Sequence, residues 1–283
     1  MAILNNVSFE GLLEFAGFRR NPTYGVAFAG GGARGFAHVG VIRALEEYGI
    51  RPQILSGVSA GSIAAVLYGA GLSPKEMWDC FSEFQKFGDF TEFAVPTSGF
   101  FTLDKFGKLL DSWLPVKKLE ELKIPTIVCA TNYDKGTSVG WAKGDIVPRV
   151  LASCSIPILF KPMVINGTHY VDGGVLRNLP AWAIRNHCRV LIGSNCSPIR
   201  TNHKYKASLI DIAERSFHLM SKANVLQDVQ LCDYVITPEG MAGVKTFDLR
   251  GDTTMAPIGT SSRSIASRAS PSAIRINFSS CSC

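Results

Sequence analysis

The chain has 283 residues, and its hydrophobic content of 46% is ample for a well-packed core in one large domain or two small ones. It carries 29 basic and 23 acidic side chains, a formal net charge of +6, and shows no cluster of basic residues interleaved with aromatic ones. This pattern argues against a nucleic-acid partner and is compatible with weak attraction to an anionic membrane surface. Neither the first twenty residues nor the nearly uncharged stretch 54–74 has the pattern of a secretory signal or a membrane span, so we expect a cytoplasmic globular protein.

The first elements along the chain alternate between strand and helix. Residues 24–29 form a short apolar run that ends in glycines, which is typical of a buried parallel strand, and residues 38–49 place apolar side chains at helical spacing before a glycine stop. Residues 52–71 repeat the pattern as a strand, a tight turn and a helix that is packed on all sides. Further strands are expected at 124–132, 189–198 and 233–237, and further helices at 145–157 and 208–231. This alternation predicts the α/β class, with a mainly parallel sheet covered by helices on both faces in one domain, residues 22–258.

Three segments depart from this alternation. Residues 75–122 are helical and aromatic, and they form either a cap that faces the substrate or a part of the buried helical core. Residues 259–283 are rich in serine and contain no acidic residue, a composition typical of a disordered tail. Residues 1–21 form a lead segment before the first strand.

Gly57, Ser59 and Gly61 form the pattern G-x-S-x-G between an apolar, strand-like run and the helix-like sequence SIAAVLYGA. This is the context of a nucleophile elbow, in which a serine lies on a strand-to-helix turn so sharp that its neighbours must be small. A serine hydroxyl becomes a good nucleophile only when a base takes its proton, and the oxyanion that then forms needs preorganised donors. If Ser59 is a nucleophile, the chain must also supply a base and a set of oxyanion donors, and a second glycine-rich turn could provide the donors.

The second glycine-rich turn contains Gly30, Gly31, Gly32 and Gly35, between the first strand and the helix that follows it. Backbone N–H groups at the start of a helix favour negative charge, so this loop suits either a phosphate or an oxyanion. A Walker loop would end in Gly-Lys-Ser/Thr, whereas Arg34 stands here before the last glycine. A dinucleotide fold would place an acidic residue at the end of the second strand, where this chain has the serine elbow.

A base for the serine could be a histidine or a carboxylate. The chain has five histidines in contexts that favour packing or surface positions, with His38 expected to support the helix after the glycine loop: His38, His169, His187, His203 and His218. Asp172 follows a short strand and precedes Gly173 and Gly174, which would let another part of the backbone approach closely. An Asp-Gly turn in a hairpin is the alternative interpretation of this motif.

Taken together, GGGARG at 30–35, GVSAG at 57–61, ASCSIP at 152–157 and DGG at 172–174 resemble the motifs of the patatin-like phospholipase family in order and spacing. The resemblance covers roughly residues 22–250, and only the Ser-rich tail departs from the family's pattern.

This resemblance implies a patatin-like three-layer α/β/α fold related to that of cytosolic phospholipase A2. It also implies a Ser-Asp dyad without a catalytic histidine, with Ser59 as the nucleophile and Asp172 as the base. The oxyanion hole would be formed by backbone N–H groups around Gly31 and Gly32, and Arg34 would brace the loop. Members of the family hydrolyse acyl esters of phospholipids and other lipids without a metal or cofactor, so the expected partner is a lipid ester, reached by transient contact with a membrane or micelle.

Two alternatives stay open. The chain could be a Ser-His-Asp esterase or thioesterase with a histidine late in the sequence, or a non-enzymatic nucleotide-binding module that uses the glycine loop. If it is a lipid hydrolase, we expect the acyl chain to lie against the aromatic side chains of 75–122: Phe84, Phe87, Phe90, Phe100, Phe101 and Trp113.

Overall fold

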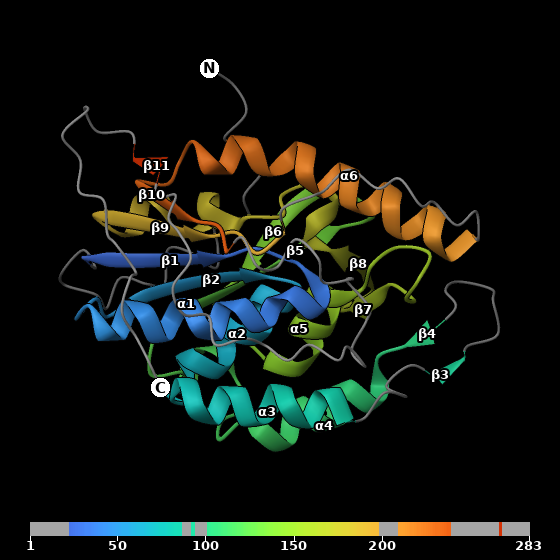
Figure 1. Ribbon diagram of the computed structural model, residues 1–283. Coiled ribbons are helices and arrows are strands. Elements are labelled where there is room, and N and C mark those ends of the chain that lie inside the picture. The colour runs from blue at the N-terminus through green and yellow to red at the C-terminus, as the bar shows by residue number, and fades with distance from the viewer. Residues whose placement is uncertain (1–22, 87–91, 94–100, 198–208, 239–265, 268–283) are drawn as a thin grey trace.

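The computed structural model describes residues 23–86, 92–93, 101–197, 209–238 and 266–267. Within these residues a nine-stranded sheet forms the centre of the protein, in the order β11-β10-β9-β1-β2-β5-β8-β7, with β6 paired to β5 (Figure 1). The strands that run parallel to one another are β1 Tyr24–Phe28, β2 Ile54–Val58, β5 Thr126–Asn132, β9 Val190–Ser194 and β10 Tyr234–Ile236. All five lie where the sequence predicts a strand, which confirms the mainly parallel sheet.

The sheet also contains antiparallel strands that the alternation of strand and helix does not predict. They are β6 Thr137–Trp141, β7 Met163–Ile165, β8 Thr168–Asp172 and β11 Ala266–Ser267. Only β8 corresponds to a sequence prediction, the short strand before Asp172. A separate antiparallel pair is formed by β3 Glu92–Phe93 and β4 Phe101–Thr102.

Helices cover both faces of the sheet, which confirms the three-layer α/β/α architecture (Figure 1). One face is covered by α1 Phe36–Glu47, α2 Ala60–Gly69 and α5 Ile146–Cys154, and α3 Pro74–Lys86 and α4 Asp104–Trp113 pack outside them. The other face is covered by the long helix α6 Leu209–Val229. None of the helices in the described ranges has the length and apolar content needed to cross a membrane.

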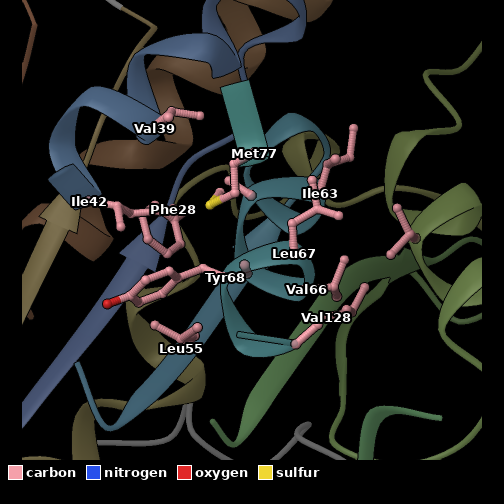
Figure 2. Packing of buried hydrophobic residues seen from close by; sticks show 14 of the residues in the cluster. Phe28, Val39, Ile42, Leu55, Ile63, Val66, Leu67, Tyr68, Met77 and Val128 are labelled. Carbon is pink, nitrogen blue, oxygen red and sulfur yellow. The ribbon is translucent and has the colours of Figure 1, made fainter. Parts of the chain in front are cut away.

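The core follows from the two-residue period of the central strands. In β1, Val26 and Phe28 join the apolar cluster under α1 and α2, while the residue between them packs on the opposite face. Every residue of α2 is buried, as expected for a helix packed on all sides. Figure 2 shows how side chains from α2 interlock with Phe28 and with Met77 of α3.

The described helices of segment 75–122 belong to this core. Met77 and Phe81 of α3 and Phe106 and Leu110 of α4 are all buried in the same apolar cluster as α1 and α2. Their spacing of four residues places each pair on one face of its helix, so these helices bury an ordinary amphipathic face. For the described residues, the buried-core interpretation is the one that the structure supports.

The predicted segments at the two ends of the chain lie almost wholly outside the described residues. Of the Ser-rich segment 259–283, only the two residues of β11 are described, and they pair with β10. The lead segment 1–21 is not described at all. The domain boundaries therefore stay a prediction.

Candidate active site

Ser59 lies at the sharp turn between β2 and α2, with backbone angles of φ 53° and ψ −128°. A non-glycine residue rarely adopts a positive φ, and it does so mainly where the surrounding packing fixes it. The two glycines of the elbow allow this packing. A Cβ on Gly57 would collide with the backbone of Gly61 and Ser62, and a Cβ on Gly61 would collide with the carbonyl oxygens at the end of β1.

A buried hydroxyl holds the backbone of Ser59 in this position. Ser153 of α5 accepts a hydrogen bond from the Ser59 N–H at 2.8 Å and donates one to the carbonyl oxygen of Cys129 at 2.6 Å. Ser153 is fully buried, so both bonds are shielded from water. It belongs to the ASCSIP motif, but nothing in the local sequence of 152–157 indicates this bond.

Asp172 is the last residue of β8, and the antiparallel pairing of β8 with β5 places it opposite Ala130. Strand β5 lies between β8 and β2, the strand that leads to Ser59. Its backbone N–H donates to the carbonyl oxygen of Ser155 at 2.8 Å, and its carbonyl oxygen accepts from Thr131 Oγ1 at 3.1 Å. The Asp-Gly pair does not form a hairpin turn. Asp172 instead caps the short 3-10 turn Gly173–Val175, with Oδ1 accepting the Gly174 N–H at 2.7 Å.

The Asp172 carboxyl is fully buried, and this burial raises its pKa from 3.8 to about 7. Two groups oppose the shift by stabilising the carboxylate: the Ser59 hydroxyl and the Gly174 N–H. Oδ2 is buried, and the Ser59 side chain lies near enough to the carboxyl to lower its pKa. The arrangement is a hydroxyl beside a buried carboxyl that exchanges a proton near neutral pH.

Cys154 is a third titratable group near these two. Burial raises the pKa of its thiol, and the charge of Asp172 raises it further. At neutral pH the thiol therefore stays protonated and does not compete with the Ser59 hydroxyl as a nucleophile.

The glycine loop packs directly on Ser59. A Cβ on Gly30 would lie 3.1 Å from the Ser59 Cβ and 2.5 Å from Asn178 Oδ1, so only glycine fits there. Gly30 is fixed by Asn178, whose carbonyl oxygen accepts the Gly30 N–H at 3.0 Å, and by Ser197 Oγ, which donates to the Gly30 carbonyl oxygen at 2.6 Å. Within the described part of the chain, the N–H groups of Gly31 and Gly32 donate no hydrogen bond.

The other glycines of the predicted motifs also have close neighbours. Gly32 has φ +58°, a left-handed conformation that glycine adopts without strain. A Cβ on Gly35 would lie 2.6 Å from the Cβ of Ala60, and one on Gly173 would lie 3.0 Å from the carbonyl oxygen of Cys129. The glycine loop and the Asp-Gly-Gly turn are thus brought together with the elbow.

Arg34 connects the loop to α6. Its side chain is buried and lines the cavity in front of Ser59, and one guanidinium nitrogen lies 3.5 Å from His218 Nε2. Burial lowers the Arg34 pKa, while the nearby Glu214 acts in the opposite direction.

The histidines divide between packing, surface and cavity positions. His38 is buried, with Nδ1 2.8 Å from Ser194 Oγ and Nε2 2.8 Å from the carbonyl oxygen of Ala29, which confirms its structural role. His169 is exposed beside Asp134, and His203 lies outside the described residues. The expectation of a surface position was wrong for His218, which lines the cavity, and burial lowers its pKa to about 4. Among the described residues, no hydrogen bond joins a histidine to Ser59.

A cavity of about 250 Å³ opens in front of Ser59 and extends along α6. Its apolar lining comes from Ile156 and from four residues of α6, and its polar lining includes Asn178, Asn195, Ser197 and Ser221. Of the aromatic residues expected to contact the acyl chain, Trp113 packs against the core and donates to Glu83 at 3.0 Å, away from this lining. Phe87, Phe90 and Phe100 lie outside the described residues, and the side chains of Phe84 and Phe101 are not described.

Helix α6 also holds the Asp-Gly-Gly turn in place. The carbonyl oxygen of Gly174 accepts hydrogen bonds from Ser221 Oγ at 3.0 Å and from Asn224 Nδ2 at 2.8 Å. Farther along the helix, the buried Asp228 pairs with both Nε and a terminal nitrogen of Arg177, at 2.6 and 2.7 Å. Sequence reasoning missed these residues because serine, asparagine and aspartate on a helix give no local signal of a distant partner.

The described residues contain no group of three His, Cys, Asp or Glu side chains arranged to hold a metal ion. The groups beside Ser59 are the Asp172 carboxyl with its raised pKa and the N–H groups of the glycine loop, and Arg34 and His218 line the same cavity.

Comparisons with known proteins identify the family. The family model described as patatin-like phospholipase matches residues 26–184. Among curated proteins, the chain is 32% identical over 160 residues to lysophospholipase nte1 of Aspergillus fumigatus, an alignment that covers 55% of this chain and 10% of that protein. It is 29% identical over 161 residues to an NTE family protein of Mycobacterium tuberculosis, covering 56% of this chain and 45% of that one. The chain thus spans about a tenth to under half of the length of these relatives.

Solved structures give more distant matches. VipD from Legionella pneumophila matches with a TM-score of 0.45 and 17% identity, covering 70% of this chain and 53% of that one. Human GIVD cytosolic phospholipase A2 matches with a TM-score of 0.35 and 14% identity, covering 66% of this chain and 43% of that one.

Proposed function

The chain belongs to the patatin-like phospholipase family, and on this basis we propose that it is a lipid acyl hydrolase of the phospholipase A or lysophospholipase type. The observation that carries the proposal is the pairing of Ser59, on a strained strand-to-helix turn, with a buried carboxyl whose pKa is raised to about 7. A general base is most effective when its pKa lies near the working pH, because it can then accept and return a proton within one cycle. The names of the fungal relatives support lysophospholipids as the first substrates to test.

In the proposed reaction, Ser59 Oγ attacks the acyl carbonyl carbon while Asp172 accepts the hydroxyl proton. Asp172 then returns this proton to the departing alcohol oxygen, which leaves an acyl group on Ser59. In the second half, Asp172 takes a proton from water, and the resulting hydroxide attacks the acyl group. When the resulting tetrahedral intermediate collapses, Asp172 returns its proton to Ser59 Oγ, which regenerates the Ser59 hydroxyl and releases the fatty acid.

The oxyanion would be held by the glycine loop. Gly31 and Gly32 are suited to this role because their N–H groups donate no hydrogen bond within the described residues, and because Gly30 next to them contacts Ser59. Removing one preorganised donor of this kind typically lowers kcat by about 10²- to 10³-fold, so each is worth roughly 3 kcal/mol. Arg34 would brace the loop from the cavity side, where it reaches α6.

The acyl chain would lie in the cavity along α6. The side chains of Ile156, Phe217, Val225 and Val229 give this cavity an apolar wall that begins at Ser59. An acyl chain gains free energy on leaving water for such a wall, at about 25 cal/mol per Å² of apolar surface buried.

A Ser-His esterase is the second candidate function, because His218 lines the same cavity as Ser59. Burial lowers the His218 pKa to about 4, which leaves the imidazole neutral at pH 7 but makes it a weak base. Against this candidate, the side chain that acts on the pKa of Asp172 is Ser59, and no histidine is among the causes of that shift.

A fluorophosphonate probe tests both candidates, since it forms a covalent adduct with an activated serine. We expect one adduct, on Ser59, together with hydrolysis of a lysophospholipid; both are lost in Ser59→Ala and strongly reduced in Asp172→Asn. The variant His218→Gln separates the candidates because it keeps a polar side chain in the cavity. Retained hydrolysis in His218→Gln supports the Ser-Asp dyad, whereas loss of hydrolysis there, or an adduct on another residue, contradicts it.

A further inference from the structure

Helix α6 carries an exposed apolar stripe on the side that faces away from the sheet. It consists of four large hydrophobic side chains that are between 39% and 63% exposed: Ile212, Leu219, Met220 and Leu226. Three of them recur every seven residues, which is two helical turns, so they lie on one face of the helix. Soluble proteins scatter such residues singly over the surface, and a row of them along one helix indicates a contact surface.

The stripe borders the mouth of the active-site cavity. Leu226 both lines the cavity and is 63% exposed, and Lys222 lines the cavity and is exposed. The buried face of the same helix, with Ser221 and Val225, forms the cavity wall. A molecule that lies against the stripe therefore reaches the opening that leads to Ser59.

Two cations accompany the stripe on the flank that turns toward the cavity. Arg215 and Lys222 are seven residues apart and thus share one side of α6. Within the described part of the chain, neither side chain forms an ion pair. Asp211 and Glu214 are the acidic residues of this part of the helix, and Glu214 interacts with Arg34. From Arg215 onward the charged residues of the helix are Arg215, Lys222 and the buried Asp228, which pairs with Arg177, so the charge beside Leu219 and Leu226 is positive.

We propose that the stripe and its two cations form the surface by which the protein docks on an anionic lipid interface, so that a lipid can pass from the interface into the cavity. This inference rests on the proposed lipid hydrolase function. An apolar helix face that lies in the headgroup region, with Lys or Arg at its edge, is the usual form of an interfacial membrane contact.

A lipid surface fits the stripe better than a second copy of the chain does. A standard protein interface buries roughly 800 Å² on each partner, which is well beyond what four partly exposed side chains supply. In a symmetric pair of α6 helices, Arg215 and Lys222 would lie near their own copies if the helices are parallel, or near each other if they are antiparallel, and in both cases like charges repel. Anionic headgroups would instead neutralise both cations.

Vesicle co-sedimentation tests the proposal independently of catalysis. The protein is used as Ser59→Ala so that no lipid is consumed, with vesicles of phosphatidylcholine alone or mixed with phosphatidylglycerol. We expect Leu219→Glu to weaken binding to the mixed vesicles by roughly tenfold or more, since a charge replaces apolar surface that enters the interface. Val164→Glu is the matched control: Val164 on the edge strand β7 is also 50% exposed, and its change should leave binding within about twofold, as for surface changes away from an interface.

Two further variants complete the test. Lys222→Gln should lower binding to mixed vesicles by about fivefold and leave binding to phosphatidylcholine alone unchanged, because one Lys near an anionic surface is worth about 1 kcal/mol. Leu219→Ser gives the same direction as Leu219→Glu by a milder change, and circular dichroism checks that each variant folds. With Ser59 intact, Leu219→Glu should hydrolyse a short, water-soluble ester at the unaltered rate and vesicle lipid more slowly.

The outcomes separate the docking surface from the proposed function. Equal vesicle binding by the original chain, Leu219→Glu and Leu219→Ser overturns the docking surface. It is also overturned if Leu219→Glu converts a dimer into a monomer in sedimentation velocity while vesicle binding is unchanged, because the stripe then joins two copies. An inability of the original chain to hydrolyse any ester would contradict the lipid hydrolase function, and the vesicle measurement would still decide the docking surface.

Discussion

Replacing Asp172 by Asn should make the protein more stable at neutral pH while it removes activity. Burial raises the pKa of the Asp172 carboxyl from 3.8 to about 7, so between these pH values the folded protein holds a proton that the unfolded chain has lost. The contribution of Asp172 to the unfolding free energy therefore falls as the pH rises through this window, because stability decreases wherever the folded state binds more protons than the unfolded chain does. Below pH 4 the contribution is absent, and above pH 7 the full destabilisation is present. Asn cannot ionise and therefore does not contribute this loss.

The size of the effect follows from the width of the window. Each pH unit between the two pKa values is worth about 1.4 kcal/mol, so the total loss is about 4 kcal/mol, of which about 3 kcal/mol falls between pH 5 and pH 8. Asp172→Asn avoids this loss, but its gain in stability at neutral pH is partly offset. One atom of the Asn amide would be buried at the place of Oδ2, which has no hydrogen-bond partner among the described residues. That offset does not depend on pH, so the slope of the difference against pH is the quantity to measure.

Urea unfolding, followed by the fluorescence of the four tryptophans, gives the unfolding free energy at each pH from 5 to 8. Burial lowers the pKa of His38 and of His218 to about 4, so each makes the protein more stable as the pH rises toward 6.5. These terms occur in both proteins and cancel in the difference between Asp172→Asn and the original chain. Ser59→Ala is the matched control, because it removes the Ser59 hydroxyl and keeps the ionisable carboxyl, so the difference between Asp172→Asn and Ser59→Ala should show the same slope against pH. A difference between Asp172→Asn and the original chain that stays constant from pH 5 to pH 8 would refute the raised pKa, and with it the fitness of Asp172 as the base.

Two more changes test how the elbow is held. Ser153→Ala removes the acceptor of the Ser59 N–H. We therefore expect kcat on a soluble ester to fall by about tenfold, which is about 1.4 kcal/mol, with KM nearly unchanged. A rise in KM at constant kcat would contradict a positioning role for Ser153. Gly61→Ala forces a Cβ against the carbonyl oxygens at the end of β1 and should lower the unfolding free energy by about 3 kcal/mol or more. Gly136→Ala is its control, because Gly136 has φ +64° and an added Cβ there would meet no other atom. This change should lower the unfolding free energy by only about 1 kcal/mol. Equal losses for the two variants in thermal unfolding would contradict the tight packing around Gly61.

The local features of the fold could be predicted from the sequence because they depend on neighbours in the chain. The central parallel strands are short, largely apolar and buried along their length, and the elbow at Ser59 is bounded by glycines at positions where an added Cβ would have no room. The antiparallel strands are different. The five residues of β6 are all half-buried, and β7 has only three residues, so neither gives an apolar run or a clear alternation. Each pairs with a strand next to it in the chain, β6 with β5 across residues 133–136 and β7 with β8 across the turn Asn166–Gly167, so the signal that was missed is the turn and not a distant partner.

The candidate site was predictable where a motif marks it and not where a single polar residue completes it. Asp172 stands in a glycine-flanked motif, whereas Ser153 and Asn178 are ordinary serine and asparagine residues until the fold brings them to Ser59 and Gly30. The position of His218 depends on which face of α6 turns toward the sheet, and the mixed composition of this helix does not decide that. Aromatic content was equally indecisive in residues 75–122, because a phenylalanine suits a core as well as a cap.

The part of the chain that positions Asp172, the proposed base, extends beyond the region that the family model matches. That region ends at residue 184, yet α6, which starts at Leu209, supplies two hydrogen bonds to the carbonyl oxygen of Gly174. The N–H of the same glycine donates to Asp172 Oδ1, so α6 fixes the peptide that positions the carboxyl. The pairing of Asp228 with Arg177 anchors the helix on the same segment, and its buried face forms the cavity wall. A chain cut after residue 184 would keep Ser59 and Asp172 but would lose the contacts that hold the Asp-Gly-Gly turn and enclose the cavity. For this reason a protein used to test the proposed activity has to include α6.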